Sequence, residues 1–193
     1  MLKCLNVKMT AKGFTLVEIL VAVGLFLAVT AVVFGAYVFI IRSQVRALAQ
    51  QELLNQTSYA MEYMSRALRM AKKDLTNSCL GASSSGYNYW GANGWIRFLN
   101  YKDKCQEFSL SGGRLRQRES SDSTSGNFGM YSFLTSSDFS VSQFLVGASG
   151  YSGWSQGDAI QASITFLLDI SGRENTNIRI QTTVSQRDLD VRY

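Results

Sequence analysis

The chain contains, close to its start, Lys12-Gly13-Phe14-Thr15-Leu16-Val17-Glu18, and from Phe14 an apolar run continues unbroken to Ile41. The run has 28 residues, and Glu18 is its only charged side chain. It exceeds the roughly 20 residues that span about 30 Å of hydrocarbon. It is also longer than the roughly 7–15-residue apolar region of a secretory signal peptide, so a removable signal peptide cut near residues 47–49 is the weaker interpretation. The sequence therefore predicts a membrane-spanning helix over residues 14–41.

Positive charge is concentrated before the apolar run. Lys3, Lys8 and Lys12 contribute three units of the formal net charge of +5, and residues 1–13 contain no acid. The remaining +2 is ordinary for a soluble domain. Basic residues before a span favour a cytoplasmic N-terminus, although Arg42 and Arg46 on the far side weaken this argument.

Of the three cysteines, one precedes the apolar run and two follow it. Cys4 lies in the basic leader, whereas Cys79 and Cys105 follow the apolar run. An even pair in an oxidising compartment is most simply a disulfide, and two free buried thiols are the alternative. With no histidine anywhere, a zinc site has little support, and we expect no metal or cofactor.

Residues 42–75 predict a continuation of the helix. They contain no glycine or proline and are rich in good helix formers. An apolar side chain recurs every seven residues, with two more between, which predicts one apolar helix face. These residues are Leu54, Met61, Leu68 and Leu75, then Met64 and Ala71. We expect one helix from Phe14 to about Leu75, with stop signals at Asn77 and Gly81.

Beyond residue 80 the apolar period changes to two. Residues 160–170 and 178–184 alternate about a turn at 171–175, which predicts an antiparallel hairpin with one buried face. A second hairpin is predicted about Ser111-Gly112-Gly113, and further strands over 95–101 and 139–146. Loops are expected over residues 81–94, 119–137 and 147–157, the second of them with short helical turns. We expect an α+β fold in which four to six antiparallel strands pack on the second half of the helix.

Residue types that carry catalysis are scarce. The usual general base is missing because the chain has no histidine, and no G-x-x-x-x-G-K-[ST] phosphate loop is present. We therefore expect that this chain is not an enzyme.

Glu18 is the residue that requires a functional explanation. A carboxylate within an apolar span is unfavourable by a few kcal/mol and needs a partner. Cleavage after Gly13 would free the amine of Phe14, whose positive charge a neighbouring subunit's Glu18 could neutralise. A glutamate that extends to the nearby membrane interface is the alternative, because Glu18 lies only five residues into the run.

Gly13, Phe14, Thr15, Leu16 and Glu18 together resemble the N-terminus of the type IV prepilins and type II secretion pseudopilins, a basic leader ending in glycine followed by Phe-Thr-Leu-x-Glu. The resemblance implies that a prepilin peptidase cuts between Gly13 and Phe14 and methylates the Phe14 amine. It also gives Glu18 the role of the family's assembly glutamate and places residues from 42 onward outside the cytoplasm.

Two departures refine this resemblance. Many major pilins carry a proline midway in the apolar helix, whereas this chain has none. The large β-rich head is similar to that of PilW-like minor pilins and J-type minor pseudopilins, and the presence of Glu18 disfavours the extreme tip subunit, which lacks it.

Arg114, Arg116 and Arg118 alternate, so we expect them on one face of a strand. With the nearby aromatic residues at 87–95, they are a candidate ligand surface for nucleic acid. The solvated face of a sheet is the simpler interpretation, since the mature net charge is only +2.

The resulting domain prediction is a removed leader (1–13), a transmembrane and filament-core helix (14–41), an amphipathic second half of the helix (42–78) and a β-rich head (79–193). The predicted function is a minor pilin or minor pseudopilin that helps to initiate or cap a filament. The expected partners are other pilin subunits, a prepilin peptidase and the inner membrane. The alternatives are a DNA-uptake or adhesive pilin and a single-span anchored domain that never polymerises.

Overall fold

The computed structural model describes residues 13–81, 89–147 and 163–187. By its internal contacts the chain forms two units, Met1–Val45 and Arg46–Tyr193, which are described separately below.

The first unit consists mainly of the N-terminal part of helix α1 (Leu16–Arg69). Apart from half-buried Val38, its large apolar side chains from Phe14 to Ile41 are between 41% and 77% exposed. In the described part of the chain, α1 is the one helix whose length and composition would let it cross a membrane. Thr30, a polar residue in this segment, directs its hydroxyl to the carbonyl oxygens of Phe26 and Leu27, at 2.9 and 3.0 Å. The Thr30 hydroxyl is therefore satisfied within the helix.

In the second unit, α1 buries one face against the sheets. The buried positions follow the 3.6-residue period of a helix: Leu53, Thr57, Ala60, Met61, Met64 and Leu68. The predicted face is partly wrong, because Leu54 is 46% exposed and Leu75 is 62% exposed. Leu54 lies one residue, or about 100° of rotation, from Leu53, which takes the inner position.

The helix ends at Arg69 and not near Leu75. After Met70 the chain pairs with a strand, since the Lys72 N–H donates to the Leu99 carbonyl at 2.8 Å. The buried Asp74 carboxylate then accepts the N–H groups of Cys79 and Leu80, both at 2.9 Å. Good helix formers continue to residue 75, but these long-range bonds take the place of the helical ones.

The last carbonyls of α1 are satisfied by distant segments. The Tyr89 hydroxyl donates to the Leu68 carbonyl at 2.7 Å, and the Arg187 N–H donates to the Arg69 carbonyl at 2.8 Å. The Gln186 amide donates to the Ala71 carbonyl just beyond the helix. Carbonyls at a helix end have no partner within the helix, so these bonds fix where the helix stops.

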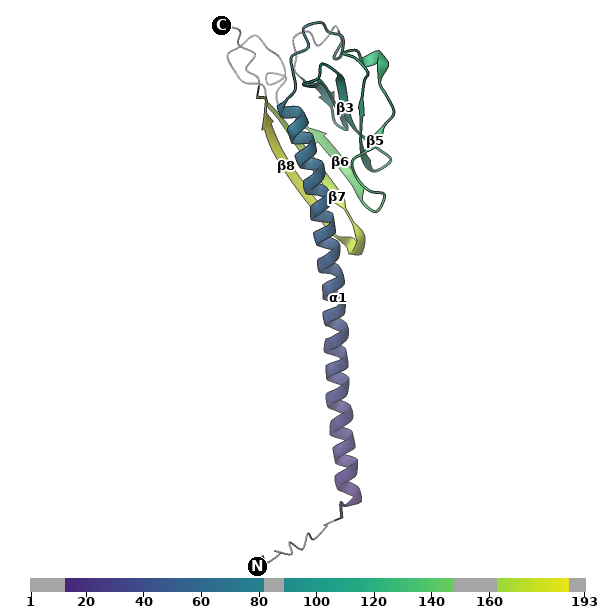
Figure 1. Cartoon of the computed structure of the whole chain (residues 1–193). Coiled ribbons are helices and arrows are strands. Elements are labelled where there is room, and N and C mark those ends of the chain that lie inside the picture. Colours follow the sequence, from purple (N-terminus) through teal and green to yellow (C-terminus); the bar gives the residue numbers. More distant parts are fainter. Residues whose placement is uncertain (1–12, 82–88, 148–162, 188–193) are drawn as a thin grey trace, which may run out of the picture. The chain divides into compact units, whose positions relative to one another are not determined.

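The described strands form two antiparallel sheets (Figure 1). The first has the order β1-β2-β3-β4-β5 and the second the order β6-β7-β8. The bounds are β1 (Tyr89–Ala92), β2 (Trp95–Leu99), β3 (Cys105–Ser111), β4 (Arg114–Glu119), β5 (Ser132–Phe133), β6 (Ser140–Val146), β7 (Ser163–Ser171) and β8 (Asn177–Ser185).

The predicted hairpins are confirmed as β3–β4 and β7–β8. The prediction of four to six strands is wrong, because the described residues contain eight strands in two sheets. β1 lies in the stretch 81–94 and β5 in the stretch 119–137, both predicted as loops; the latter also holds a short helical turn, η2 (Ser125–Asn127). The predicted loop beyond Gly147, and residues 160–162 of the predicted strand, lie outside the described residues.

Both sheets contribute to one core with the second half of α1, and β7 and β8 lie alongside that part of the helix (Figure 1). Along β7, Ile164, Phe166, Leu168 and Ile170 are buried in strict alternation. Two backbone bonds of 2.7 Å join the sheets, from the Gly94 N–H to the Phe144 carbonyl and from the Val141 N–H to the Gly113 carbonyl. The head is thus a helix covered by two connected sheets, which is an α+β arrangement.

Side chains alternate between the buried and the exposed face along β7 and β8, and substitutions on the two faces should differ in their effect on stability. Phe166→Ala should lower the free energy of unfolding by about 3–5 kcal/mol, because it empties a fully buried site packed on Phe144. Gln181→Ala, on the exposed face of β8, should change it by less than about 0.5 kcal/mol. Denaturant unfolding of the full chain in detergent measures both, and equal effects would show that the faces are assigned wrongly.

Candidate functional site

The start of α1 positions Glu18. Thr15 precedes the helix, and its hydroxyl accepts the Glu18 N–H at 3.3 Å. Thr15-Leu16-Val17-Glu18 is the sequence of a capping box, in which a threonine and a glutamate three residues later satisfy the free N–H groups of a helix start. A carboxylate in the first turn is also favoured by the helix dipole. Thr15 and Glu18 therefore have a local structural reason to be where they are.

The Glu18 side chain has no cationic partner in the part of the chain that the structure describes. It is exposed, and no basic group there lies within 4.0 Å of its carboxylate. Gly13 and Phe14 are exposed beside it, Phe14 by 77%. A carboxylate surrounded by apolar side chains is stable in hydrocarbon only with a partner, which residues 13–81, 89–147 and 163–187 do not supply.

The apolar surface of residues 14–41 is too large to face water. A helix that is apolar on all sides is found inside a membrane or inside an assembly of helices, and contiguous apolar patches beyond a few hundred Å² mark interaction surfaces. The segment therefore needs lipid or other apolar helices around it.

Comparison with known proteins agrees with this geometry. Residues 8–34 match the family model of the prokaryotic N-terminal methylation motif, the type IV pilin signal. Neither a curated protein nor a solved structure matches the chain. Together with the long apolar helix and the antiparallel sheets, the motif is consistent with a type IV pilin-like protein and with anchoring in a membrane. Nothing in these comparisons covers the head.

A disulfide joins Cys79 and Cys105, with 5.3 Å between their Cα atoms. Both residues are fully buried in a small cluster with Leu80 and Leu99. The bridge connects the turn after α1 to the start of β3 and closes a loop of 26 residues. By the chain-entropy account, such a loop stabilises the folded state by about 3–4 kcal/mol.

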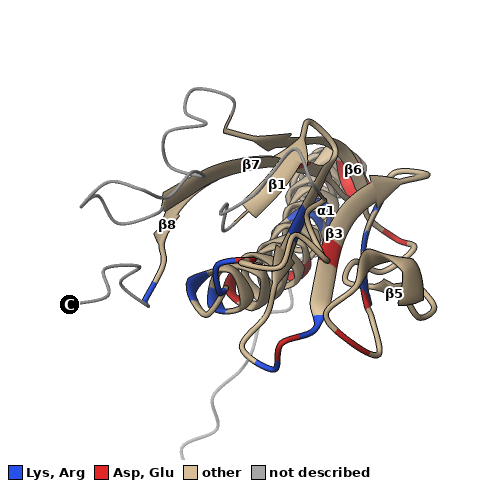
Figure 2. Ribbon diagram, turned by 90° about the horizontal axis from the view of Figure 1, so that it is seen from above, with Lys and Arg blue, Asp and Glu red and all other residues tan. Residues whose placement is uncertain are grey.

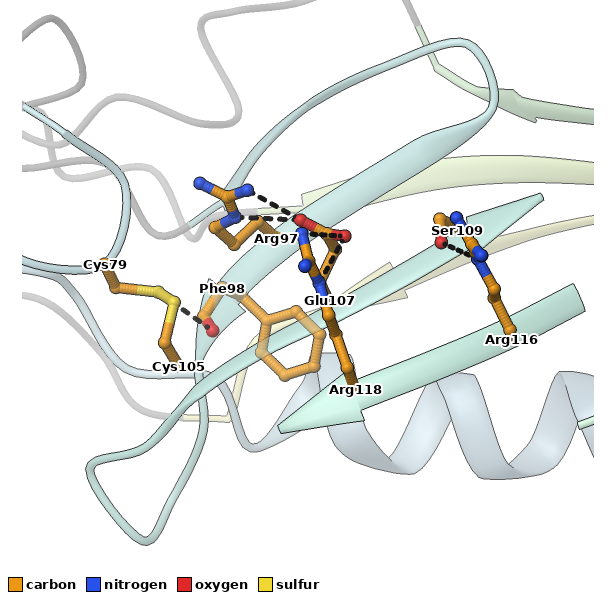
Figure 3. A network of polar contacts seen from close by, with 8 residues as sticks. All are labelled: Cys79, Arg97, Phe98, Cys105, Glu107, Ser109, Arg116 and Arg118. Atoms are coloured by element: carbon orange, nitrogen blue, oxygen red, sulfur yellow. Dashed lines mark hydrogen bonds and ion pairs between the residues drawn. A yellow bond between two sulfur atoms is a disulfide. The ribbon is translucent and has the colours of Figure 1, made fainter. Parts of the chain in front are cut away.

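The head also contains a buried carboxylate held by two arginines (Figure 3). Glu107 on β3 is 5% exposed and lies directly across from Arg97 on β2 and Arg118 on β4. Arg97 donates two bonds to one carboxylate oxygen at 3.0 and 2.7 Å, and Arg118 donates to the other at 2.9 and 2.8 Å. Both carboxylate oxygens are therefore satisfied, as a buried charge requires.

Aromatic rings from the segment before and within β5 cover the arginines of β4. The Arg118 guanidinium lies 4.1 Å from the Phe128 ring, and those of Arg116 and Arg114 lie 3.6 and 3.7 Å from the rings of Tyr131 and Phe133. Cations over aromatic faces are attracted by the ring electrons. These contacts pack residues 128–133 onto the sheet.

The prediction that Arg114, Arg116 and Arg118 lie on one strand face is confirmed. The interpretation of this face as solvated is wrong, because aromatic rings cover the three arginines. The three side chains are half-buried, and each donates within the head: to the Thr135 carbonyl, the Ser109 hydroxyl and Glu107. Their guanidinium groups lie over the rings of Phe128, Tyr131 and Phe133. Seen from above, basic and acidic residues are interspersed around β3 and β5 (Figure 2), which does not favour a nucleic-acid surface.

Asp122 fixes the turn that leads into these aromatic residues. The Thr124 hydroxyl donates to its carboxylate at 2.7 Å, the Thr124 N–H at 2.9 Å and the Asn127 amide at 2.6 Å. These bonds, that of the Thr124 hydroxyl first, hold the pKa of Asp122 below its ordinary value. Elsewhere in the head, the Asp138 carboxylate raises the pKa of Arg173 by accepting a hydrogen bond.

Removing the central carboxylate tests this cluster. Glu107→Gln should lower the free energy of unfolding by about 2–3 kcal/mol, less than the roughly 3–5 kcal/mol of a fully buried pair, because the arginines are 22% and 23% exposed. Glu119→Gln removes an exposed partner of Lys104 and should cost at most about 1 kcal/mol. Denaturant unfolding compares the two, and equal losses would contradict the structural role of Glu107.

Proposed function

We propose that this chain is a minor pilin or minor pseudopilin, a subunit that helps to initiate or cap a short filament. The observation that carries the proposal is an exposed apolar segment, residues 14–41, whose single carboxylate, Glu18, lies within a matched methylation motif. The large head, with two antiparallel sheets, supports a minor subunit that recognises specific neighbours.

The proposed maturation uses the first residues of the motif. A prepilin peptidase cuts between Gly13 and Phe14 and methylates the new amine, which removes the basic leader. Support comes from Gly13 and Phe14, which precede the first helical residue, Leu16, and are exposed. The mature N-terminus then carries one positive charge at the start of the apolar helix.

In the proposed assembly, the Glu18 carboxylate of one subunit pairs with the Phe14 amine of its neighbour. Attraction between two opposite charges is strong in hydrocarbon, since the effective dielectric constant there is low. The pair neutralises two charges that are unfavourable separately, and it sets the axial shift between adjacent helices. Residues 14–41 then pack in the filament core, and the heads remain outside the cytoplasm.

The three arginines of β4 do not favour the DNA-receptor alternative. Each already donates within the head, and a phosphate would have to displace or bypass the aromatic rings that cover them. A single-span anchor that never polymerises would use Glu18 only as a helix cap, and glutamine caps a helix equally well at this position. Assembly with other subunits accounts for the unpaired Glu18, and it does not need free arginines on β4.

The capping box provides a sharp test of Glu18. Glutamine serves as well as glutamate at this capping position, so Glu18→Gln keeps the cap and removes the charge, whereas Glu18→Ala removes both. If charge pairing drives assembly, both variants should enter the membrane but be lost from filaments. Sheared filaments or cross-linked subunits are quantified by immunoblot in a host with a type IV assembly system.

Glu62→Gln is the matched control, because Glu62 is an exposed glutamate of the same helix that pairs with Arg66, four residues away. It should assemble as the wild type does. Normal assembly of Glu18→Gln would show that Glu18 acts only as a cap and would overturn the proposed pairing.

A further inference from the structure

The head contains a pocket of about 320 Å³ beside the last turns of α1. Tyr63 and Met70 of the helix form one wall, and Tyr101 and Lys102 of the β2–β3 turn form the other, with Asn100 and Gln106 also in the lining. This volume is at the lower end of the roughly 300–1,000 Å³ of small-molecule sites. A pocket of this volume can hold one monomer unit of a larger ligand.

The wall that carries Tyr101 and Lys102 is held in place. The Asn100 side-chain oxygen accepts the N–H groups of Lys102 and Lys104 at 2.9 and 3.0 Å. Lys72 pairs with Asp103 of the same turn at 2.8 Å, and the disulfide fixes Cys105 immediately after it. The pocket therefore exists before a ligand arrives, which reduces the entropy lost on binding.

Amide groups at the base of the pocket can both donate and accept hydrogen bonds. Asn100 and Gln106 are each 4% exposed. The Asn100 amide donates to the Gln106 oxygen at 3.4 Å, while the Gln106 amide and the Tyr63 hydroxyl donate to the Gln117 oxygen at 3.1 and 2.7 Å. Each amide nitrogen carries two hydrogens, so each has one N–H beyond these bonds.

The rim of the pocket has one unpaired positive charge. Arg66 pairs with Glu62, and Glu119 pairs with Lys104. Lys102 has no carboxylate within 4.0 Å in the described residues and lies 5.4 Å above the Tyr101 ring. A single negative charge on the ligand would complement it.

We propose that this pocket binds a hexuronic acid unit of an acidic glycan. The Lys102 ammonium pairs with the sugar carboxylate, the Asn100 and Gln106 amides bond to ring hydroxyls, and the apolar face of the sugar lies against the Tyr101 ring. A purely apolar acid would offer no acceptor to the second N–H of the Asn100 and Gln106 amides. A neutral sugar would leave the charge of Lys102 unused.

Binding of three small probes to the full chain in detergent tests the proposal. Glucuronate carries both recognised features, glucose lacks the carboxylate, and cyclohexanecarboxylate lacks the hydroxyls. Saturation-transfer NMR and titration should show glucuronate binding at least about tenfold more tightly than either other probe, and this preference should weaken at high salt.

Substitutions locate the site. Lys102→Gln should weaken glucuronate binding by about tenfold and leave glucose unchanged, and Tyr101→Ala should weaken both sugars. Both residues are exposed, and circular dichroism verifies that the variants fold. Lys73→Gln is the matched control, because Lys73 is a neighbouring lysine outside the lining.

Three results would overturn the proposal: no binding of glucuronate, equal binding of cyclohexanecarboxylate, or an undiminished affinity in Lys102→Gln. Because the site lies in the head and is measured without filament assembly, its outcome is independent of the Glu18 experiment.

Discussion

The apolar surface of residues 14–41 is the constraint on which the rest of the molecule depends. In hydrocarbon every backbone N–H and C=O must find a partner within the segment, and α1 meets this requirement without a proline anywhere in the chain. Its apolar side chains are nevertheless exposed on all sides. The backbone of the segment is therefore satisfied by its own hydrogen bonds, whereas its side chains lack packing partners and need lipid or other apolar helices around them.

The second half of α1 shows the opposite behaviour, because the head supplies its packing. One face is buried at Leu53, Met64 and Leu68, and the carbonyls near its end are bonded by Tyr89, Gln186 and Arg187. These partners lie about 20 and about 115 residues away in sequence. The disulfide, the buried ion cluster and the bonds at the helix end together hold the head in one arrangement.

Local pattern was sufficient to predict the helix, the β7–β8 hairpin and the β3–β4 hairpin, since each is determined by neighbours in the sequence. The turn at residues 111–113 even fixes the register that places Glu107 opposite Arg118, so half of the ion cluster could have been inferred. Asn93-Gly94, a strong hairpin signal, could have revealed β1. The glycine-rich composition concealed this strand, in which Gly91 is needed because a Cβ there would lie 2.5 Å from the Trp95 carbonyl oxygen.

Long-range contacts decided the features that the sequence did not predict. Arg69 ends the helix because Lys72 pairs with Leu99, and neither residue signals this locally. Phe128, Tyr131 and Phe133 cover the arginines although their stretch is rich in serine and glycine. Likewise, the pocket beside Tyr101 forms from three separate segments, residues 63–70, 100–106 and 119, that only the tertiary fold brings together.

The central claim is that the chain is processed as a prepilin, and mass analysis of its N-terminus tests this most directly. The full chain is expressed in bacterial membranes with and without a prepilin peptidase, and the intact mass and the N-terminal peptide are measured. The account predicts a mature chain that begins at N-methylated Phe14 only when the peptidase is present. An uncut chain in the presence of active peptidase, or one cut beyond Ile41, would contradict it.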